Sequence, residues 1–293
     1  MDAIVIGTSS QKLGSRLATE LGVQAIPVES KIFPDGESYI RIPEDVEKKE
    51  IAVVQSTYQP QDKNLIELFL IIDALDALKV KTVTVIVPYL AYARQDKRFK
   101  PGEAISSQTI IRIIEHMRAH YFFTCNIHKE EILSQFTIPA FNISTMPAIA
   151  DYIQSLGFKN PLILSPDRGG AHLAKEVATK IHTDFAVFEK HRDRKTGEVK
   201  TEFKKLEVHN REVVIVDDII STGSTIANVA EIVKKQGAKY VITTCAHPIL
   251  ATGALDRMKM AGIDMILGTD CVESPISKIT VAPLLAQALR KIT

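Results

Sequence analysis

The chain has 293 residues, 45% hydrophobic and 24% charged, so it can bury a substantial core and its length favours two domains. Lysine and arginine total 36 against 35 acidic residues, and the net charge of +1 argues against general attraction to nucleic acid or to a membrane surface. The three cysteines, Cys125, Cys245 and Cys271, lack CxxC spacing, which argues against a disulfide framework and a structural zinc site.

Neither an export signal nor a membrane span is expected. The first ten residues, MDAIVIGTSS, have no basic leader and are typical of a first strand. The most apolar helical stretch, 65–78, contains Glu67, Asp73 and Asp76, which make it too polar to cross a bilayer. We therefore expect a cytoplasmic protein.

Apolar runs of strand length alternate with helical patterns along the chain, which indicates an α/β fold with mainly parallel sheets flanked by helices. The predicted strands are 3–6, 51–55, 83–87, 121–125, 162–164, 185–188, 213–216, 240–244 and 265–267. The predicted helices are 11–21, 62–78, 106–118, 147–156, 170–181, 223–236 and 281–291.

The two halves of the sequence are loosely alike. The strand IAVVQS leads through a loop into a helix, as PLILSP does in the second half, and TVTVIVP similarly matches EVVIVDD. We infer a degenerate duplication that gives two domains, 1–145 and 146–293.

Residues 213–225, VVIVDDIISTGST, carry the strongest functional signal. The β-branched run predicts a strand buried on both faces, and Asp217 and Asp218 at its carboxyl end can accept hydrogen bonds from paired sugar hydroxyls. The hydroxyls and amides of 221–225 open a predicted helix, whose N-terminus favours an anion. The alternative is an ordinary helix cap beside two solvated acids. The combination favours a phosphorylated pentose.

This stretch resembles the phosphoribosyl-diphosphate (PRPP) binding motif of the type I phosphoribosyltransferase superfamily. The resemblance implies that ribose 5-phosphate is bound by Asp217, Asp218, Ser221, Thr222, Gly223, Ser224 and Thr225. The motif is shared by transferases and synthetases, so it does not decide between them.

Five further segments say little about function when each is considered alone. FPDGES (33–38) is an ordinary turn, and YARQDKRFK (92–100) is a basic loop at a strand end that could bind polyphosphate. CNIH (125–128) places a histidine just after a strand, and SPDRGG (165–170) places Asp167, a hard oxygen ligand, in a glycine turn. EKHRDRKTGEVK (189–200) is a polar loop rich in cations.

Together and in this order, the segments resemble the ribose-phosphate diphosphokinase family. The resemblance implies transfer of the diphosphoryl group of ATP to C1 of ribose 5-phosphate, giving PRPP and AMP for nucleotide biosynthesis, with Mg²⁺ as cofactor. It also implies a homo-oligomer in which the ATP site is shared between subunits. It assigns ATP binding to Phe33, Asp35, Gly36, Glu37, Arg94 and Gln95, metal binding to His128 and Asp167, and catalysis to Lys190 and Arg192, with Arg192 also contacting ribose 5-phosphate.

The sequence departs from the family pattern at two positions. Asn126 stands where an acid is common, and Ser221 stands where many members carry Asp. Three rival functions remain. A nucleobase phosphoribosyltransferase would not need the segments at 33–38 and 92–100. A non-catalytic regulatory subunit should have lost the loop of Lys190, and a PRPP-sensing repressor should show a basic recognition element.

Overall fold

A computed structural model describes residues 1–188 and 207–292, which form two compact units. Unit 1 comprises Met1–Ser144, Asp270–Glu273 and Thr280–Thr293, and unit 2 comprises Thr145–Thr269 and Ser274–Ile279. Residues 270–273 and 280–293 belong with unit 1, although they follow most of unit 2 in the chain.

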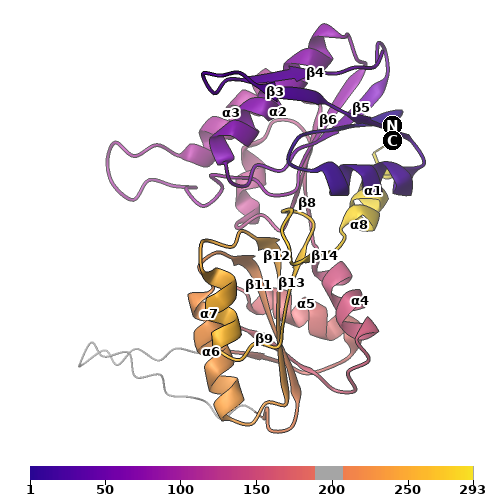
Figure 1. Cartoon of the computed structure of the whole chain (residues 1–293). Helices are drawn as coiled ribbons and strands as arrows, with labels where there is room; N and C mark the ends of the chain where they lie inside the picture. Colours follow the sequence, from indigo (N-terminus) through magenta and orange to yellow (C-terminus); the bar gives the residue numbers. More distant parts are fainter. Residues whose placement is uncertain (189–206, 293) are drawn as a thin grey trace. The chain divides into compact units, whose positions relative to one another are not determined.

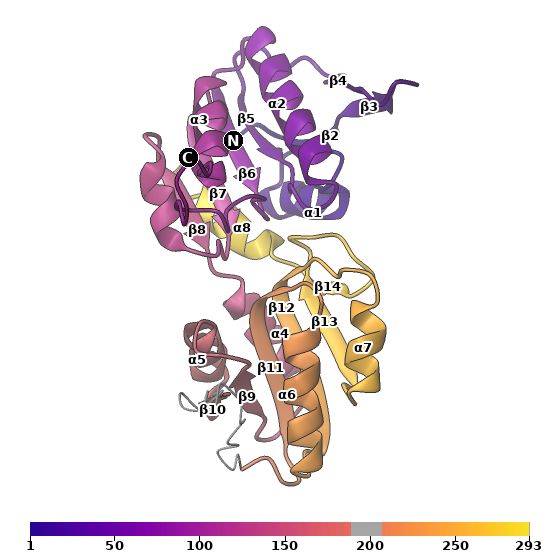
Figure 2. The ribbon, with the colours of Figure 1, turned by 90° about the vertical axis from the view of Figure 1, so that its left-hand side faces the viewer.

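Unit 1 is built on a six-stranded parallel sheet in the order β2-β1-β5-β6-β7-β8. Its strands are β1 (Ala3–Ile6), β2 (Gln24–Pro27), β5 (Glu50–Val54), β6 (Thr82–Val87), β7 (Tyr121–Cys125) and β8 (Ala140–Ile143). Its helices are α1 (Gln11–Leu21), α2 (Gln61–Ala77), α3 (Ser106–His116), the 3₁₀ helix η1 (Glu130–Gln135) and α8 (Ala282–Leu289). A separate antiparallel hairpin, β3 (Glu29–Ile32) and β4 (Ser38–Arg41), lies beside α2 (Figure 2).

Both faces of this sheet are covered. Apolar side chains of α2 and α3 pack with one set of strand residues, such as Val5 and Val53, while α1 and α8 pack with the alternate set, such as Ile4 and Val54. The uninterrupted apolar runs predicted from the sequence reflect this two-sided burial. The C-terminal helix α8 packs on α1 in the same layer (Figure 1).

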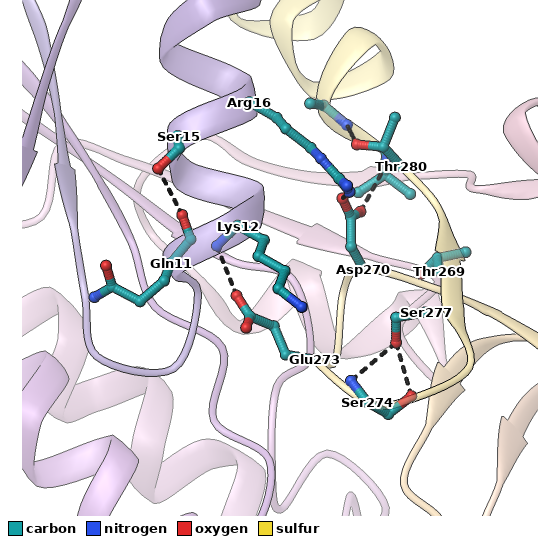
Figure 3. A network of polar contacts seen from close by, with 12 residues as sticks. Gln11, Lys12, Ser15, Arg16, Thr269, Asp270, Glu273, Ser274, Ser277 and Thr280 are labelled. Atoms are coloured by element: carbon teal, nitrogen blue, oxygen red, sulfur yellow. Dashed lines mark hydrogen bonds and ion pairs between the residues drawn. The ribbon is translucent and has the colours of Figure 1, made fainter.

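Two carboxylates hold the C-terminal segment in unit 1. The buried Asp270 accepts hydrogen bonds from Arg16 Nη1 at 2.7 Å and from the Val281 N–H at 2.9 Å (Figure 3). Glu273 accepts the N–H of Lys12 at 2.7 Å, in the first turn of α1 (Figure 3). A carboxylate is favoured at a helix N-terminus, so both contacts anchor the C-terminal segment on α1.

Unit 2 repeats the architecture, with a parallel sheet in the order β10-β9-β11-β12-β13-β14. Its strands are β9 (Leu162–Ser165), β10 (Phe185–Val187), β11 (Glu212–Ile220), β12 (Tyr240–Pro248), β13 (Met265–Thr269) and β14 (Ser277–Ile279). The helices α4 (Met146–Ser155) and α5 (Ala171–Ile181) cover one face, and α6 (Ser224–Lys235) and α7 (Ala254–Met260) cover the other (Figure 1).

The two sheets share one strand order, as a duplication predicts. The topology corrects the strand matching made from the sequence, however. By position in the sheet, β1 corresponds to β9 and β5 corresponds to β11. The matching of the two halves from sequence pairs β5 with β9, so that matching is shifted by one strand.

Cys125, Cys245 and Cys271 are buried and form no disulfide. Among residues 1–188 and 207–292, every helix is too short or too polar to serve as a membrane-spanning segment.

Candidate active site

The candidate pentose site lies at the carboxyl edge of the sheet in unit 2. Strands β9 and β11 are parallel neighbours, so the turn that follows β9 and the end of β11 meet at one edge. The turn is held by Asp167, whose Oδ1 accepts the Gly170 N–H at 3.1 Å, while Ser165 Oγ donates to the Asp167 carbonyl at 2.7 Å. A Cβ on Gly170 would lie 2.9 Å from Ser165 Oγ and 3.6 Å from Asp217 Oδ1, so glycine allows the turn to approach Asp217 closely.

Asp217 and Asp218 lie within β11, which continues to Ile220 instead of ending at Val216. The strand is longer than predicted because it pairs with the equally long β12, in a register that places Asp217 opposite Cys245. The Asp218 N–H donates to Asp217 Oδ1 at 2.9 Å, and the Ile219 N–H donates to Asp218 Oδ1 at 2.7 Å. These bonds hold both carboxylates partly buried at the edge of the sheet.

Asp217 is electrostatically unusual. Its burial, followed by the negative charge of Asp218 and then smaller effects that include Asp167, raises the pKa of Asp217 to about 8. Burial therefore favours the protonated form of Asp217, beside the carboxyl groups of Asp218 and Asp167. Such a place favours a ligand that donates hydrogen bonds or carries positive charge.

Beside the acid pair, Ser221–Gly223 lead into the N-terminus of α6. Gly223 is the N-cap residue with φ of 70°, and the Ser224 N–H donates to Thr222 Oγ1 at 3.4 Å. The Thr222 carbonyl accepts a hydrogen bond from Arg257 Nη1, and the Ser221 carbonyl accepts the Ala251 N–H at 3.0 Å. The first-turn N–H groups of a helix have no intrahelical acceptor, so this loop presents amides and hydroxyls suited to a phosphate.

Gly223 is required by both backbone and space. Its positive φ disfavours other residues, and an added Cβ would lie 3.0 Å from Met258 Cγ and 3.3 Å from the Ala254 carbonyl oxygen. The loop conformation and the start of α6 thus depend on one residue.

In unit 1, the predicted ATP residues 33–37 form the turn of the hairpin β3–β4. The Phe33 N–H donates to the Glu37 carbonyl at 2.8 Å, and the Glu37 N–H donates to Asp35 Oδ1 at 3.3 Å. Phe33 and Tyr39 meet edge to face at 6.2 Å between ring centroids, with Lys31 Nζ 4.6 Å from the Phe33 centroid. The turn is exposed, but its aromatic side chains are already ordered by one another.

The base of the hairpin is held by the buried Glu67 of α2. Glu67 Oε1 accepts the Ser38 hydroxyl at 2.8 Å and lies 3.2 Å from Lys63 Nζ, while Oε2 accepts the Thr8 hydroxyl. A buried carboxylate is tolerated only when it is paired and hydrogen-bonded in this way. The position of the hairpin therefore depends on α2 and on the loop after β1.

The other predicted ATP residues lie in loops that follow β6 and β7. Arg94 is exposed, and Gln95 donates through its side-chain amide to the Lys97 carbonyl at 3.1 Å. His128 is exposed and follows the buried Asn126, which has φ of 36°, a conformation that asparagine tolerates better than most residues. Because β6 and β7 are parallel neighbours, both loops belong to one sheet edge.

The counterpart of the pentose site in unit 1 is filled by its own side chains. At the end of β5, Gln55 Oε1 accepts the Ser9 N–H at 3.1 Å, and Ser56 Oγ donates to the Cys271 carbonyl at 2.6 Å. Thr57 Oγ1 donates to the Tyr89 carbonyl at 2.8 Å. These side chains are buried and hydrogen-bonded within unit 1, where they occupy the place that the acid pair and the hydroxyl loop have in unit 2.

Comparisons with known proteins decide the family. Residues 3–117 match the model of the N-terminal domain of ribose phosphate pyrophosphokinase, and residues 133–270 match the phosphoribosyl transferase domain. The ribose-phosphate pyrophosphokinases of Sulfolobus acidocaldarius and Methanosarcina acetivorans are each 40% identical over 290 residues, which cover 99% of this chain and 99% of theirs. The chain belongs to the ribose-phosphate pyrophosphokinase family.

A solved structure agrees with this family and with the fold predicted from the sequence. The phosphoribosylpyrophosphate synthetase from Mycobacterium smegmatis is 26% identical with a TM-score of 0.85, over 100% of this chain and 99% of that one. The family, the α/β class and the two-domain architecture predicted from motifs and periodicity are thereby confirmed.

Two predicted catalytic residues of this pyrophosphokinase family member, Lys190 and Arg192, lie outside the described residues. Within residues 1–188 and 207–292, no cluster of three or more histidine, cysteine or acidic side chains is arranged to hold a metal. The predicted metal ligands belong to different units, His128 to unit 1 and Asp167 to unit 2. Their roles stay predictions.

Two structural contributors were missed from the sequence. Glu67 was interpreted only as a polar interruption of an apolar helix. Lys129 directly follows His128, and its ammonium lies 2.5 Å from Asp96 Oδ2. Local sequence carries little signal for either, because Thr8 and Ser38 lie far from Glu67 along the chain, as Asp96 does from Lys129.

Proposed function

We propose that the chain transfers the diphosphoryl group of ATP to the C1 hydroxyl of ribose 5-phosphate, giving PRPP and AMP for nucleotide biosynthesis. Family membership over the full chain supports this activity. The observation in the structure that carries the proposal is the carboxylate pair Asp217–Asp218 beside the amide and hydroxyl loop of α6. This arrangement suits a ligand with vicinal hydroxyls at one end and a phosphate at the other.

In the pentose site, Asp217 and Asp218 accept hydrogen bonds from the ring hydroxyls. The 5-phosphate binds the loop of Ser221, Thr222, Gly223, Ser224 and Thr225, where the helix dipole and first-turn amides stabilise a dianion. Both ends of the sugar phosphate are then fixed, and its C1 hydroxyl is oriented for attack.

ATP is bound through unit 1, by Arg94 and Gln95 and by the hairpin residues Phe33, Asp35, Gly36 and Glu37. A forked guanidinium suits polyphosphate oxygens. We propose that the hairpin acts on ATP bound to a neighbouring subunit, so that the active enzyme is a homo-oligomer. Full activity of a species shown by sedimentation to be monomeric would contradict the shared site.

Mg²⁺ is the cofactor that suits these residues. Burial and the charge of Asp218 raise the pKa of Asp217, so a cation nearby would favour its ionised form, and hard oxygen donors such as Asp167 match this ion. Mg²⁺ is commonly held by one or two carboxylates together with substrate phosphates and water. Asp167 and His128 are the residues proposed to hold Mg²⁺, which when bound would supply charge stabilisation to the phosphates.

In the transfer, the C1 oxygen bonds to the β-phosphorus while the bond from that phosphorus to the oxygen of AMP breaks. The hydroxyl proton is lost to solvent or to a phosphate oxygen. Negative charge grows on the leaving and non-bridging oxygens, so positioned cations lower the barrier. We propose Lys190 and Arg192 for this role, with Arg192 also contacting ribose 5-phosphate.

Product analysis tests the proposal. Incubation with ATP, Mg²⁺ and ribose 5-phosphate should yield AMP and PRPP in equal amounts, and omission of either Mg²⁺ or the sugar phosphate should abolish both products. Formation of ADP would indicate a simple kinase. Consumption of PRPP that depends on a nucleobase would indicate a phosphoribosyltransferase, and no turnover in the presence of nucleotide binding would indicate a regulatory subunit.

A further inference from the structure

One ion pair in unit 1 joins two segments to which ATP binding has been assigned. Lys129 Nζ lies 2.5 Å from Asp96 Oδ2, although the residues are 33 positions apart in the chain. The side chains are 41% and 15% exposed, so the carboxylate is largely shielded from solvent. Another ion pair of unit 1, Lys81–Glu50, is more open, with 67% and 33% exposed.

The two partners adjoin the predicted ATP contacts. Asp96 directly follows Gln95 in the loop after β6, and Lys129 directly follows His128 in the loop after β7. Strands β6 and β7 are parallel neighbours, with Val87 opposite Thr124 near their carboxyl ends. The ion pair therefore ties one loop to the other across the sheet edge at which both strands end.

Other contacts hold the loop after β6 at different points. The Tyr92 hydroxyl donates to Asp62 of α2, and the Gln95 carbonyl accepts the Ser107 N–H at 3.3 Å and the Ser107 hydroxyl at 3.2 Å. These bonds fix the start of the loop and the backbone of Gln95. The Cys125 N–H donates to the Pro88 carbonyl at 3.2 Å where the two strands end, and the Lys129–Asp96 pair adds a side-chain link further along, between the Gln95 and His128 segments.

The hydrogen bond from Lys129 is the largest cause that lowers the pKa of Asp96, in agreement with the short distance between the two side chains.

We propose that Lys129 and Asp96 are positioning residues for ATP binding. Their ion pair holds Arg94 and Gln95 in a fixed position relative to His128. This proposal rests on the proposed function, because it assumes that these three residues contact the nucleotide. Loss of the pair should let the two loops separate, and small misplacements of binding groups are costly. Ribose 5-phosphate binding, assigned to unit 2, should be unaffected.

The test compares K129M, D96N, the double variant K129M/D96N and the conservative K129R with wild type. Each single neutral variant should raise the KM for ATP about tenfold, while the double variant should be no worse than either single one, as coupled partners require. K129R should retain most of the affinity. The KM for ribose 5-phosphate and the midpoint of thermal unfolding should stay near wild type.

K81M is the matched control, because it removes an ion pair of the same unit at the amino end of β6. It should leave both KM values unchanged. Equal loss for ATP and ribose 5-phosphate, additive losses in the double variant, or wild-type KM for ATP in K129M would overturn the positioning role. If K129M folds poorly, the KM values of D96N and K129R are compared with those of wild type instead.

Calorimetric titration with Mg²⁺ and a non-hydrolysable ATP analogue separates this proposal from the proposed function. If wild type binds the analogue but forms no AMP, the function is wrong, while the ion pair is still tested by the affinities of the variants. If wild type forms AMP and the variants bind the analogue as tightly as wild type, only the positioning role is wrong.

Discussion

The raised pKa of Asp217 predicts that binding of ribose 5-phosphate releases a proton. Burial and the neighbouring charge of Asp218 raise this pKa to about 8, so the carboxyl is about nine-tenths protonated at pH 7 in the ligand-free protein. Accepting two sugar hydroxyls requires the carboxylate. Binding at pH 7 should therefore release about 0.9 proton, and affinity should rise about fivefold between pH 7 and pH 8.

Calorimetry in buffers of different ionisation enthalpy measures both quantities. D217N should abolish the proton release and flatten the pH dependence. D218N is the informative companion, because removal of the neighbouring negative charge should move the midpoint to lower pH without abolishing the release. Absence of proton release in wild type, or its persistence in D217N, would refute the assignment of the raised pKa to Asp217.

The same pKa has a consequence for stability. The folded protein holds this proton up to about pH 8, whereas an unfolded chain releases it near 3.8. The ligand-free protein should therefore lose stability as pH rises between these values, and D217N should lessen the loss. Denaturant midpoints at pH 6 and pH 8.5 for the two proteins check the sign.

Three further predictions follow from single residues. G223A should lower the free energy of unfolding by about 1–2 kcal/mol and raise the KM for ribose 5-phosphate, because the positive φ and Met258 both oppose a Cβ; unchanged denaturant unfolding would contradict the strain. D270N should destabilise unit 1 by about 1–3 kcal/mol through the loss of its charged bond to Arg16, and hydrogen exchange should rise in α8; unaltered protection there would remove this anchor. K190A should lower turnover about 10²-fold while the fold persists, and wild-type turnover would remove Lys190 from the catalytic residues.

The central strands could be predicted because they are buried on both faces. Runs such as Val213–Val216 lack polar alternation, and each of the predicted strands was found, although β11 extends further, through the acid pair to Ile220. Its extension depends on pairing with β12, which local sequence does not reveal. The strands missed from the list are short or lie at sheet edges, such as β2, where only Ile26 is buried.

The pentose loop could be predicted because its residues are contiguous, with acids, small residues and a helix start in one segment. Features that depend on partners far apart in the sequence could not be predicted. The packing of α8 on α1 through Asp270 and Arg16, the Glu67 contacts under the hairpin, and the Lys129–Asp96 pair each join residues that only the sheet brings together. The short helix α7 was also missed, since seven residues give too little periodicity to be recognised.

The most direct test of the central claim is to follow the β-phosphorus of ATP. With ATP labelled with phosphorus-32 at the β position, Mg²⁺ and ribose 5-phosphate, all of the transferred label should appear in PRPP, and the AMP formed should carry none. Label retained in a nucleoside diphosphate would contradict diphosphoryl transfer.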